Sequence, residues 1–94
     1  MPDSSARTGA ARQLAELSVG ACAIVTRLRC ERNVARRLME MGLLPGTTVQ
    51  VRRIAPLGDP MELRLRGFSL SIRRSEAERI EVEPQQPSAL RAEP

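Results

Sequence analysis

Apolar and polar residues alternate along several short stretches of the chain, which is the pattern of half-buried β-strands. The alternation is clearest in residues 61–66 and recurs in 69–73 and 79–83, and Gly67 and Phe68 are predicted to form the turn between the first two stretches. Residues 21–28 and 47–54 are rich in β-branched side chains and are also predicted as strands. The side chains expected to face inward in the last four strands are Val49, Val51, Met61, Leu63, Leu65, Leu70, Ile72, Ile80 and Val82.

A helical pattern interrupts the strands once. Val34, Leu38 and Met41 recur at spacings of four and three, which predicts an amphipathic helix over residues 34–41 with Asn33 as its N-cap. Leu38 is expected to lie in the core. A shorter helical turn is predicted near Leu14 and Leu17, and Ser75 is expected to cap another short turn over residues 75–78.

The segment RRLMEMGLLPG, residues 36–46, predicts an abrupt corner after this helix. Gly42 stands where a helix ends in a left-handed residue, a conformation that glycine adopts without strain. Pro45 and Gly46 fit the two central positions of a type II turn, in which proline sets φ and glycine accepts a positive φ. Leu38, Gly42, Pro45 and Gly46 are therefore expected to have structural roles.

Together these elements predict a mainly β domain over residues 13–83. Five short strands, one inserted helix and an N-terminal helical turn favour a small, partly open β-barrel of the SH3-like kind, since a curled sheet protects its edges. Residues 1–12 and 84–94 are poor in large apolar side chains and are expected to be disordered tails.

Composition excludes several kinds of site. The chain has no His and no Lys, which rules out Ser-His-Asp catalysis, imidazole metal ligands, a Walker A loop and Schiff-base chemistry. We therefore expect no enzyme activity, no cofactor and no resident metal site. The net charge of +4 favours binding to nucleic acid, but the arginines are scattered along the chain. Phe68 is the only aromatic residue, so the chain lacks the aromatic platform on which the bases of a single strand stack.

Two cysteines, Cys22 and Cys30, are too few for a disulfide framework. Cys22 lies within an apolar strand and is expected to be a small core residue, whereas Cys30 falls in a loop. The absence of a signal peptide and of a long apolar span predicts a cytoplasmic protein that is not embedded in a membrane.

Four segments in this order resemble the FeoA family, small cytoplasmic proteins of ferrous iron transport: LAELSVG, RRLMEMGLLPGTTVQV, APLGDPMELRLRG and LSIRRSEAERIEV. The resemblance covers about residues 14–82. It implies an SH3-like barrel and a cytosolic accessory role beside FeoB, the membrane GTPase that carries Fe(II) into bacteria. It also extends to the C-terminal domain of DtxR-type iron-dependent repressors, which makes iron-linked regulation an alternative function.

The corner is the first candidate surface for such a partner. Its helix is short, so its inner face is expected to close the barrel while Met39, Leu43 and Leu44 face outward. Together with Met41, these residues are the predicted partner-binding residues of the corner. Methionine adapts well to binding partners, and a rigid corner limits the entropy lost on binding. The same patch is expected to allow weak self-association.

The loop APLGDP, residues 55–60, is the second candidate, with Leu57 and Asp59 held outward by two prolines. A small basic barrel that binds nucleic acid is the alternative from another class. Transient binding of a transition-metal ion also stays open as an alternative.

Overall fold

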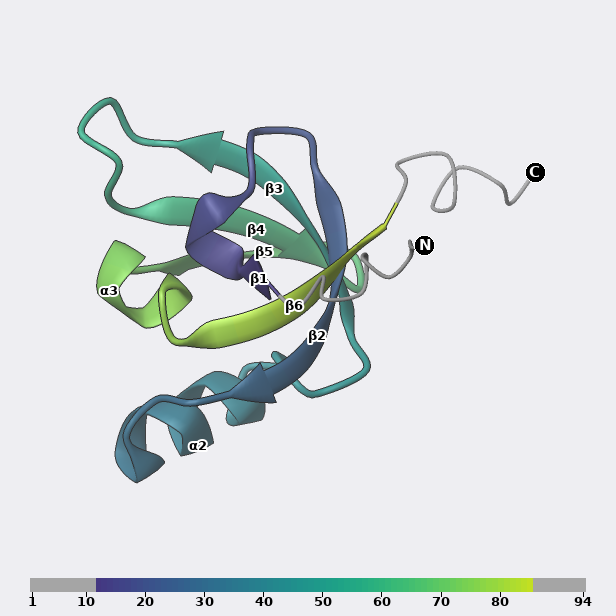
Figure 1. The fold of residues 1–94 in the computed structure, drawn as a ribbon, viewed down its shortest axis with the longest axis vertical. Coiled ribbons are helices and arrows are strands. Elements are labelled where there is room, and N and C mark those ends of the chain that lie inside the picture. Colours follow the sequence, from purple (N-terminus) through teal and green to yellow (C-terminus); the bar gives the residue numbers. More distant parts are fainter. Residues whose placement is uncertain (1–11, 86–94) are drawn as a thin grey trace, which may run out of the picture.

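The computed structural model describes residues 12–85, which form a single curled antiparallel sheet with two helices and a 3-10 turn (Figure 1). The sheet order is β1-β6-β2-β3-β4-β5. The elements are β1 (Arg12–Gln13), η1 (Leu14–Glu16), β2 (Cys22–Leu28), α2 (Arg32–Glu40), β3 (Thr48–Ile54), β4 (Met61–Leu65), β5 (Phe68–Ile72), α3 (Arg74–Ala77) and β6 (Ile80–Gln85).

The mainly β fold with one inserted helix and an N-terminal turn is confirmed, and the structure adds the two-residue strand β1. The short turn expected over residues 75–78 is the one-turn helix α3. The sheet is open, because β1 and β5 are its two ends and do not pair with each other. Register shifts curl it at two places, between Val25 and Arg27 where β2 meets β6, and between Val51 and Arg53 where β3 meets β4. Such bulges bend a strand and increase its twist.

The expected inward residues of the last four strands are all buried. In β2 the core face is the one that carries Ala23 and Val25, whereas Thr26 on the opposite face is exposed. Cys22 is buried as predicted, although it lies outside the main apolar cluster. Leu14 and Leu17 from the η1 segment and Leu38 from α2 complete the core.

Three local predictions are wrong. Helix α2 begins at Arg32 with Glu31 as N-cap, so Asn33 lies inside the first turn. Helix α3 begins at Arg74, and its first amides are bound by distant or acidic side chains instead of by Ser75. The turn between β4 and β5 consists of Arg66 and Gly67, both with positive φ, instead of Gly67 and Phe68.

The ordered strands reach slightly beyond the expected domain, because β1 starts at Arg12 and β6 ends at Gln85. The remaining residues of the two expected tails lie outside the described part of the chain. No helix within residues 12–85 has the length and apolar character that crossing a bilayer requires.

Leu38 provides a direct test of the core. Leu38→Ala should lower the free energy of unfolding by about 2–5 kcal/mol, because the fully buried side chain leaves a cavity. Urea denaturation measures the loss. Leu57→Ala is the matched control, since Leu57 is 95% exposed and its truncation should change stability by less than about 0.5 kcal/mol. Equal losses in both variants would contradict the placement of Leu38.

Candidate partner-binding site

Helix α2 ends in a Schellman motif that determines the geometry of the corner. The amide of Leu43 donates to the carbonyl of Leu38 at 3.0 Å, and the amide of Gly42 donates to that of Met39, also at 3.0 Å. Gly42 has a φ of +105°, which only glycine adopts readily. The predicted helix stop at Gly42 is therefore confirmed.

A type II turn follows and ties the corner to the sheet. The amide of Thr47 donates to the carbonyl of Leu44 at 2.9 Å, with Pro45 and Gly46 between them, and Gly46 has a φ of +95°. The amide of Gly46 then donates to the carbonyl of Val25 in β2 at 2.7 Å. The corner is thus held at both ends, by the helix and by a central strand.

The four corner residues that were predicted to bind a partner differ in exposure. Leu43 is fully buried in the core, so its expected place on an exposed partner surface is wrong. The Schellman motif turns Leu43 inward beside Leu38, as the hydrophobic contact of this motif requires. Leu44 is 43% exposed, and Met39 and Met41 are half-buried.

Phe68, the first residue of β5, adds an apolar residue that the sequence analysis did not select. It is 44% exposed, and its ring lies against the corner: a Cβ built on Gly42 would come within 3.3 Å of the Phe68 Cζ. The available signal was its position as the only aromatic residue, directly after a glycine turn. We define the corner patch as Met39, Met41, Leu44 and Phe68.

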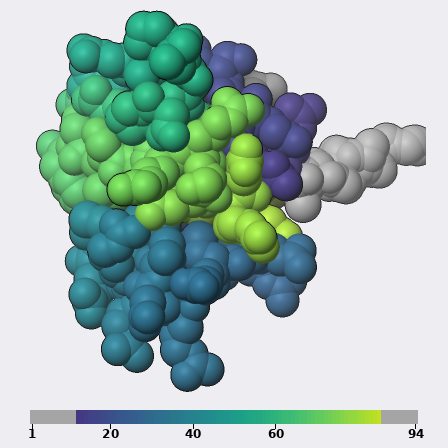
Figure 2. All heavy atoms as spheres, turned by 90° about the vertical axis from the view of Figure 1, so that its left-hand side faces the viewer, coloured from purple at the N-terminus to yellow at the C-terminus, as the bar shows by residue number. Residues whose placement is uncertain are grey.

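The loop of residues 55–60 does not join this patch. It lies at the top of Figure 1, whereas α2 lies at the bottom, and Figure 2 shows the same separation with β4, β5 and α3 between them. Leu57 is 95% exposed, as predicted for an outward residue. Asp59 is exposed but has a structural contact, because its Oδ1 accepts a hydrogen bond from the Arg74 amide at 3.1 Å and so caps α3.

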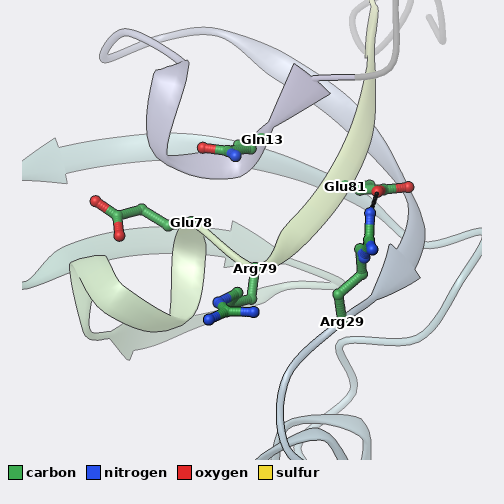
Figure 3. Close-up of a pocket in the computed structure, with 5 residues that line it drawn as sticks. All are labelled: Gln13, Arg29, Glu78, Arg79 and Glu81. Atoms are coloured by element: carbon green, nitrogen blue, oxygen red, sulfur yellow. Dashed lines mark hydrogen bonds and ion pairs between the residues drawn. The ribbon is translucent and has the colours of Figure 1, made fainter.

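Two polar clefts lie beside α3. One, of about 320 Å³, is lined by Gln13, Arg29, Glu78, Arg79 and Glu81 (Figure 3). Arg29 is paired with Glu81 at 3.0 Å, and the Glu78 carboxylate points away from that pair. The other, of about 380 Å³, shares Arg29 and Arg79 and reaches Cys30 and Val34.

Neither cleft has the composition of a metal centre. No group of three His, Cys, Asp or Glu side chains within residues 12–85 is placed to hold a metal ion. Burial raises the pKa of the Cys30 thiol from its ordinary value, and the neighbouring Glu76 carboxylate raises this pKa further. A thiol kept protonated is a poor metal ligand and a poor nucleophile.

A family model for the FeoA domain matches residues 12–84, which is nearly all of the described chain. The chain belongs to the FeoA family. In the FeoA protein of Chlorobium tepidum, a solved relative 46% identical to this chain, the fold is shared with a TM-score of 0.76 over 79% of this chain and 70% of that one.

Two further relatives place this FeoA domain in context. Stenotrophomonas maltophilia FeoA, solved with zinc and described as a prokaryotic SH3 domain protein, is 31% identical with a TM-score of 0.66, over 76% of this chain and 88% of that one. An Fe(2+) transport protein A/FeoB fusion protein of Porphyromonas gingivalis is 38% identical over 71 residues, which are 76% of this chain. The FeoA chain spans 8% of the length of that fusion protein.

Two glycine variants test the geometry of the corner. Gly42→Ala and Gly46→Ala should each cost about 1–2 kcal/mol of stability, because both positions have a left-handed backbone. Gly42→Ala should cost more, since its Cβ meets the Phe68 ring, whereas nothing lies within 4 Å of the corresponding position at Gly46. Thermal or urea unfolding measures both values. The difference should vanish when Phe68 is also changed to Ala, and its persistence would contradict the contact.

The reactivity of Cys30 tests its environment. Its alkylation by iodoacetamide should be slow at neutral pH and should still accelerate above pH 9.0, the ordinary value for the thiol pKa, because burial and Glu76 favour the protonated form. Glu76→Gln should shift the rate profile to lower pH. Mass spectrometry separates Cys30 from the buried Cys22, which serves as the internal control and should react only on unfolding. A Cys30 profile with its midpoint below pH 9.0 would contradict this environment.

Proposed function

We propose that this protein is a non-catalytic accessory component of ferrous iron uptake that acts in the cytoplasm by binding a FeoB-type membrane GTPase. The observation that carries the proposal is the fusion protein of Porphyromonas gingivalis, in which a region 38% identical to this chain is part of the same polypeptide as an Fe(2+) transporter. Domains joined in one polypeptide remain at high effective concentration. Separate chains that perform the same task need a binding surface instead.

The corner patch has the properties of such a surface. Leu44 and Phe68 expose large apolar side chains, and Met39 and Met41, which are half-buried, lie at the end of α2 that leads into the same corner. Arg36, Arg37 and Glu40 on exposed positions of α2 provide a charged surround. An apolar centre with a polar rim is the usual anatomy of a protein interface.

The rigidity of the corner favours binding. The Schellman motif and the type II turn hold Leu44 between two hydrogen-bonded anchors, the carbonyl of Leu38 in α2 and that of Val25 in β2. A surface that is ordered before it binds loses less conformational entropy in the complex. We assign the main contact with the transporter to the corner patch.

Leu57 and Asp59 are proposed as a separate, secondary contact. Leu57 projects from the opposite end of the molecule, so it can touch only a partner that is large enough to reach both ends. Asp59 would act there mainly by holding the loop against the start of α3, since its Oδ1 accepts a hydrogen bond from the Arg74 amide.

The double variant Leu44→Ser, Phe68→Ser tests the main contact. It should weaken binding to the purified cytoplasmic part of a FeoB-type transporter by about tenfold or more, because two apolar side chains no longer leave water on binding. Isothermal titration measures affinity, and uptake of radioactive iron in cells measures function. Circular dichroism and thermal melting check that the variant stays folded.

Val19→Ser is the matched control. Val19 is 59% exposed but lies in the connection between η1 and β2, away from the corner patch, so its change should leave binding and uptake intact. Leu57→Ser tests the secondary contact separately and should have a smaller effect. Native affinity and native uptake in a well-folded double variant would refute the corner patch.

A further inference from the structure

One edge of the sheet has no strand beside it. Strand β5 pairs with β4 through Leu65↔Phe68, Leu63↔Leu70 and Met61↔Ile72, and it ends the sheet order. In a two-residue hairpin the pair that closes the turn is hydrogen-bonded, and hydrogen-bonded pairs alternate with non-bonded ones along the ladder. The backbone groups of Ser69 and Ser71 therefore point away from β4.

These four groups, two amides and two carbonyls, form no backbone hydrogen bond with any residue in the range 12–85. Ser69 and Ser71 are both exposed, so water is their alternative partner. We call these four groups the β5 edge. It is a ready template for another strand.

The β5 edge also lacks the features by which proteins usually block such templates. No residue from Phe68 to Ile72 is charged or proline. The opposite end of the sheet is protected, because β1 is only two residues long and the neighbouring β6 contains Pro84. The contrast distinguishes the β5 edge from an ordinary sheet boundary.

Arginine residues lie at both ends of the β5 edge. Arg66 lies in the turn before β5, and Arg73 and Arg74 follow it directly. Arg74 is paired with Glu78 at 3.3 Å, but Arg66 and Arg73 form no ion pair with a described residue. Carboxylates placed near both ends of an added strand would therefore gain two partners.

A second copy of the chain is a poor partner for the β5 edge because of these arginines. Antiparallel self-pairing uses all four backbone groups only when Ser69 of one copy lies opposite Ser71 of the other. That register also brings the turn with Arg66 of each copy towards the end of β5 with Arg73 in the other copy, and like charges close together are destabilising.

We propose that the β5 edge binds, by strand addition, an extended peptide segment with acidic residues at both of its ends. The added strand makes four backbone hydrogen bonds with Ser69 and Ser71, and its carboxylates lie near Arg66 and Arg73. Its apolar side chains extend the inner face that carries Leu70. Phe68 connects this edge with the corner patch, so one partner can occupy both.

Strand addition of this kind recognises backbone groups and terminal charges, whichever protein supplies the segment. The probe is the acetylated and amidated peptide EVSVSVE, which alternates apolar and polar residues between two glutamates. Its charge-reversed twin KVSVSVK is the peptide control. Amide hydrogen exchange followed by NMR reports on Ser69 and Ser71 individually.

At a peptide concentration about ten times Kd, exchange of the Ser69 and Ser71 amides should slow by about tenfold, because exchange occurs only from the free protein. The lysine peptide should bind at least about tenfold more weakly, since it meets Arg66 and Arg73 with like charge. If the Ser69 and Ser71 amides are protected but the two peptides bind equally well, the proposed recognition of acidic ends is wrong.

Two variants test the edge from the side of the protein. Ser71→Pro removes one outward amide without breaking the ladder to β4 and should weaken peptide binding about fivefold, whereas Ser71→Thr keeps the amide and should bind normally. If Ser71→Pro proves unfolded, Arg66→Glu with Arg73→Glu replaces it and should reverse the peptide preference. Arg52→Glu, an exposed change on β3, is the charge control and should not affect the preference.

Two further outcomes would overturn the proposal. Unchanged Ser69 and Ser71 exchange at a saturating peptide concentration would exclude strand addition here. Protection of both amides without peptide, together with a concentration-dependent dimer in sedimentation, would assign the edge to a second copy. The peptide experiment uses the unchanged protein and no transporter, so its result does not depend on whether the corner patch variant binds the FeoB-type transporter. The two proposals can therefore fail independently.

Discussion

The hydrogen bond from the Leu43 amide to the Leu38 carbonyl determines the path of the chain after α2, and much of the structure depends on it. The bond requires the left-handed conformation at Gly42, which in turn brings the Gly42 backbone close beneath the Phe68 ring. It also places Leu38 and Leu43 together in the core, so the end of the helix is fastened by packing as well as by hydrogen bonding. The same bond leaves Leu44 exposed, so the core and the proposed partner surface meet between two neighbouring residues, Leu43 and Leu44.

The strands of this fold and the corner after α2 follow closely from the sequence. Alternation identified the buried face of β4, and the positions of Gly42 and Gly46 were correct because left-handed backbone restricts the choice of residue so strongly. The orientation of Leu43 was not predicted correctly. A helical or strand period assigns residues to faces only while the regular element continues, and Leu43 follows the residue at which α2 is reversed.

Contacts between distant segments account for two further errors, at Ser75 and at Phe68. Ser75 looked like a cap, but the first amide of α3 is bound by Asp59, 15 positions earlier in the chain. Phe68 gave no sign of its proximity to Gly42, since their contact depends on how α2 lies against the start of β5. The candidate site was therefore predicted in its position at the corner but only partly in its composition, because exposure is a property of the whole packed domain.

Strand β1 has a consequence for the way in which neighbouring segments can be attached to this domain. Arg12 pairs with Val82 and Gln13 pairs with Glu81, so the first and last described strands are adjacent in the sheet. They lie at the end of the sheet order opposite to β5. A polypeptide joined before β1 or after β6 thus leaves the domain from one side and has no need to cross the other. This arrangement lets the domain be linked to a larger protein through β1 or β6 while the sheet edge at β5 stays open to solvent.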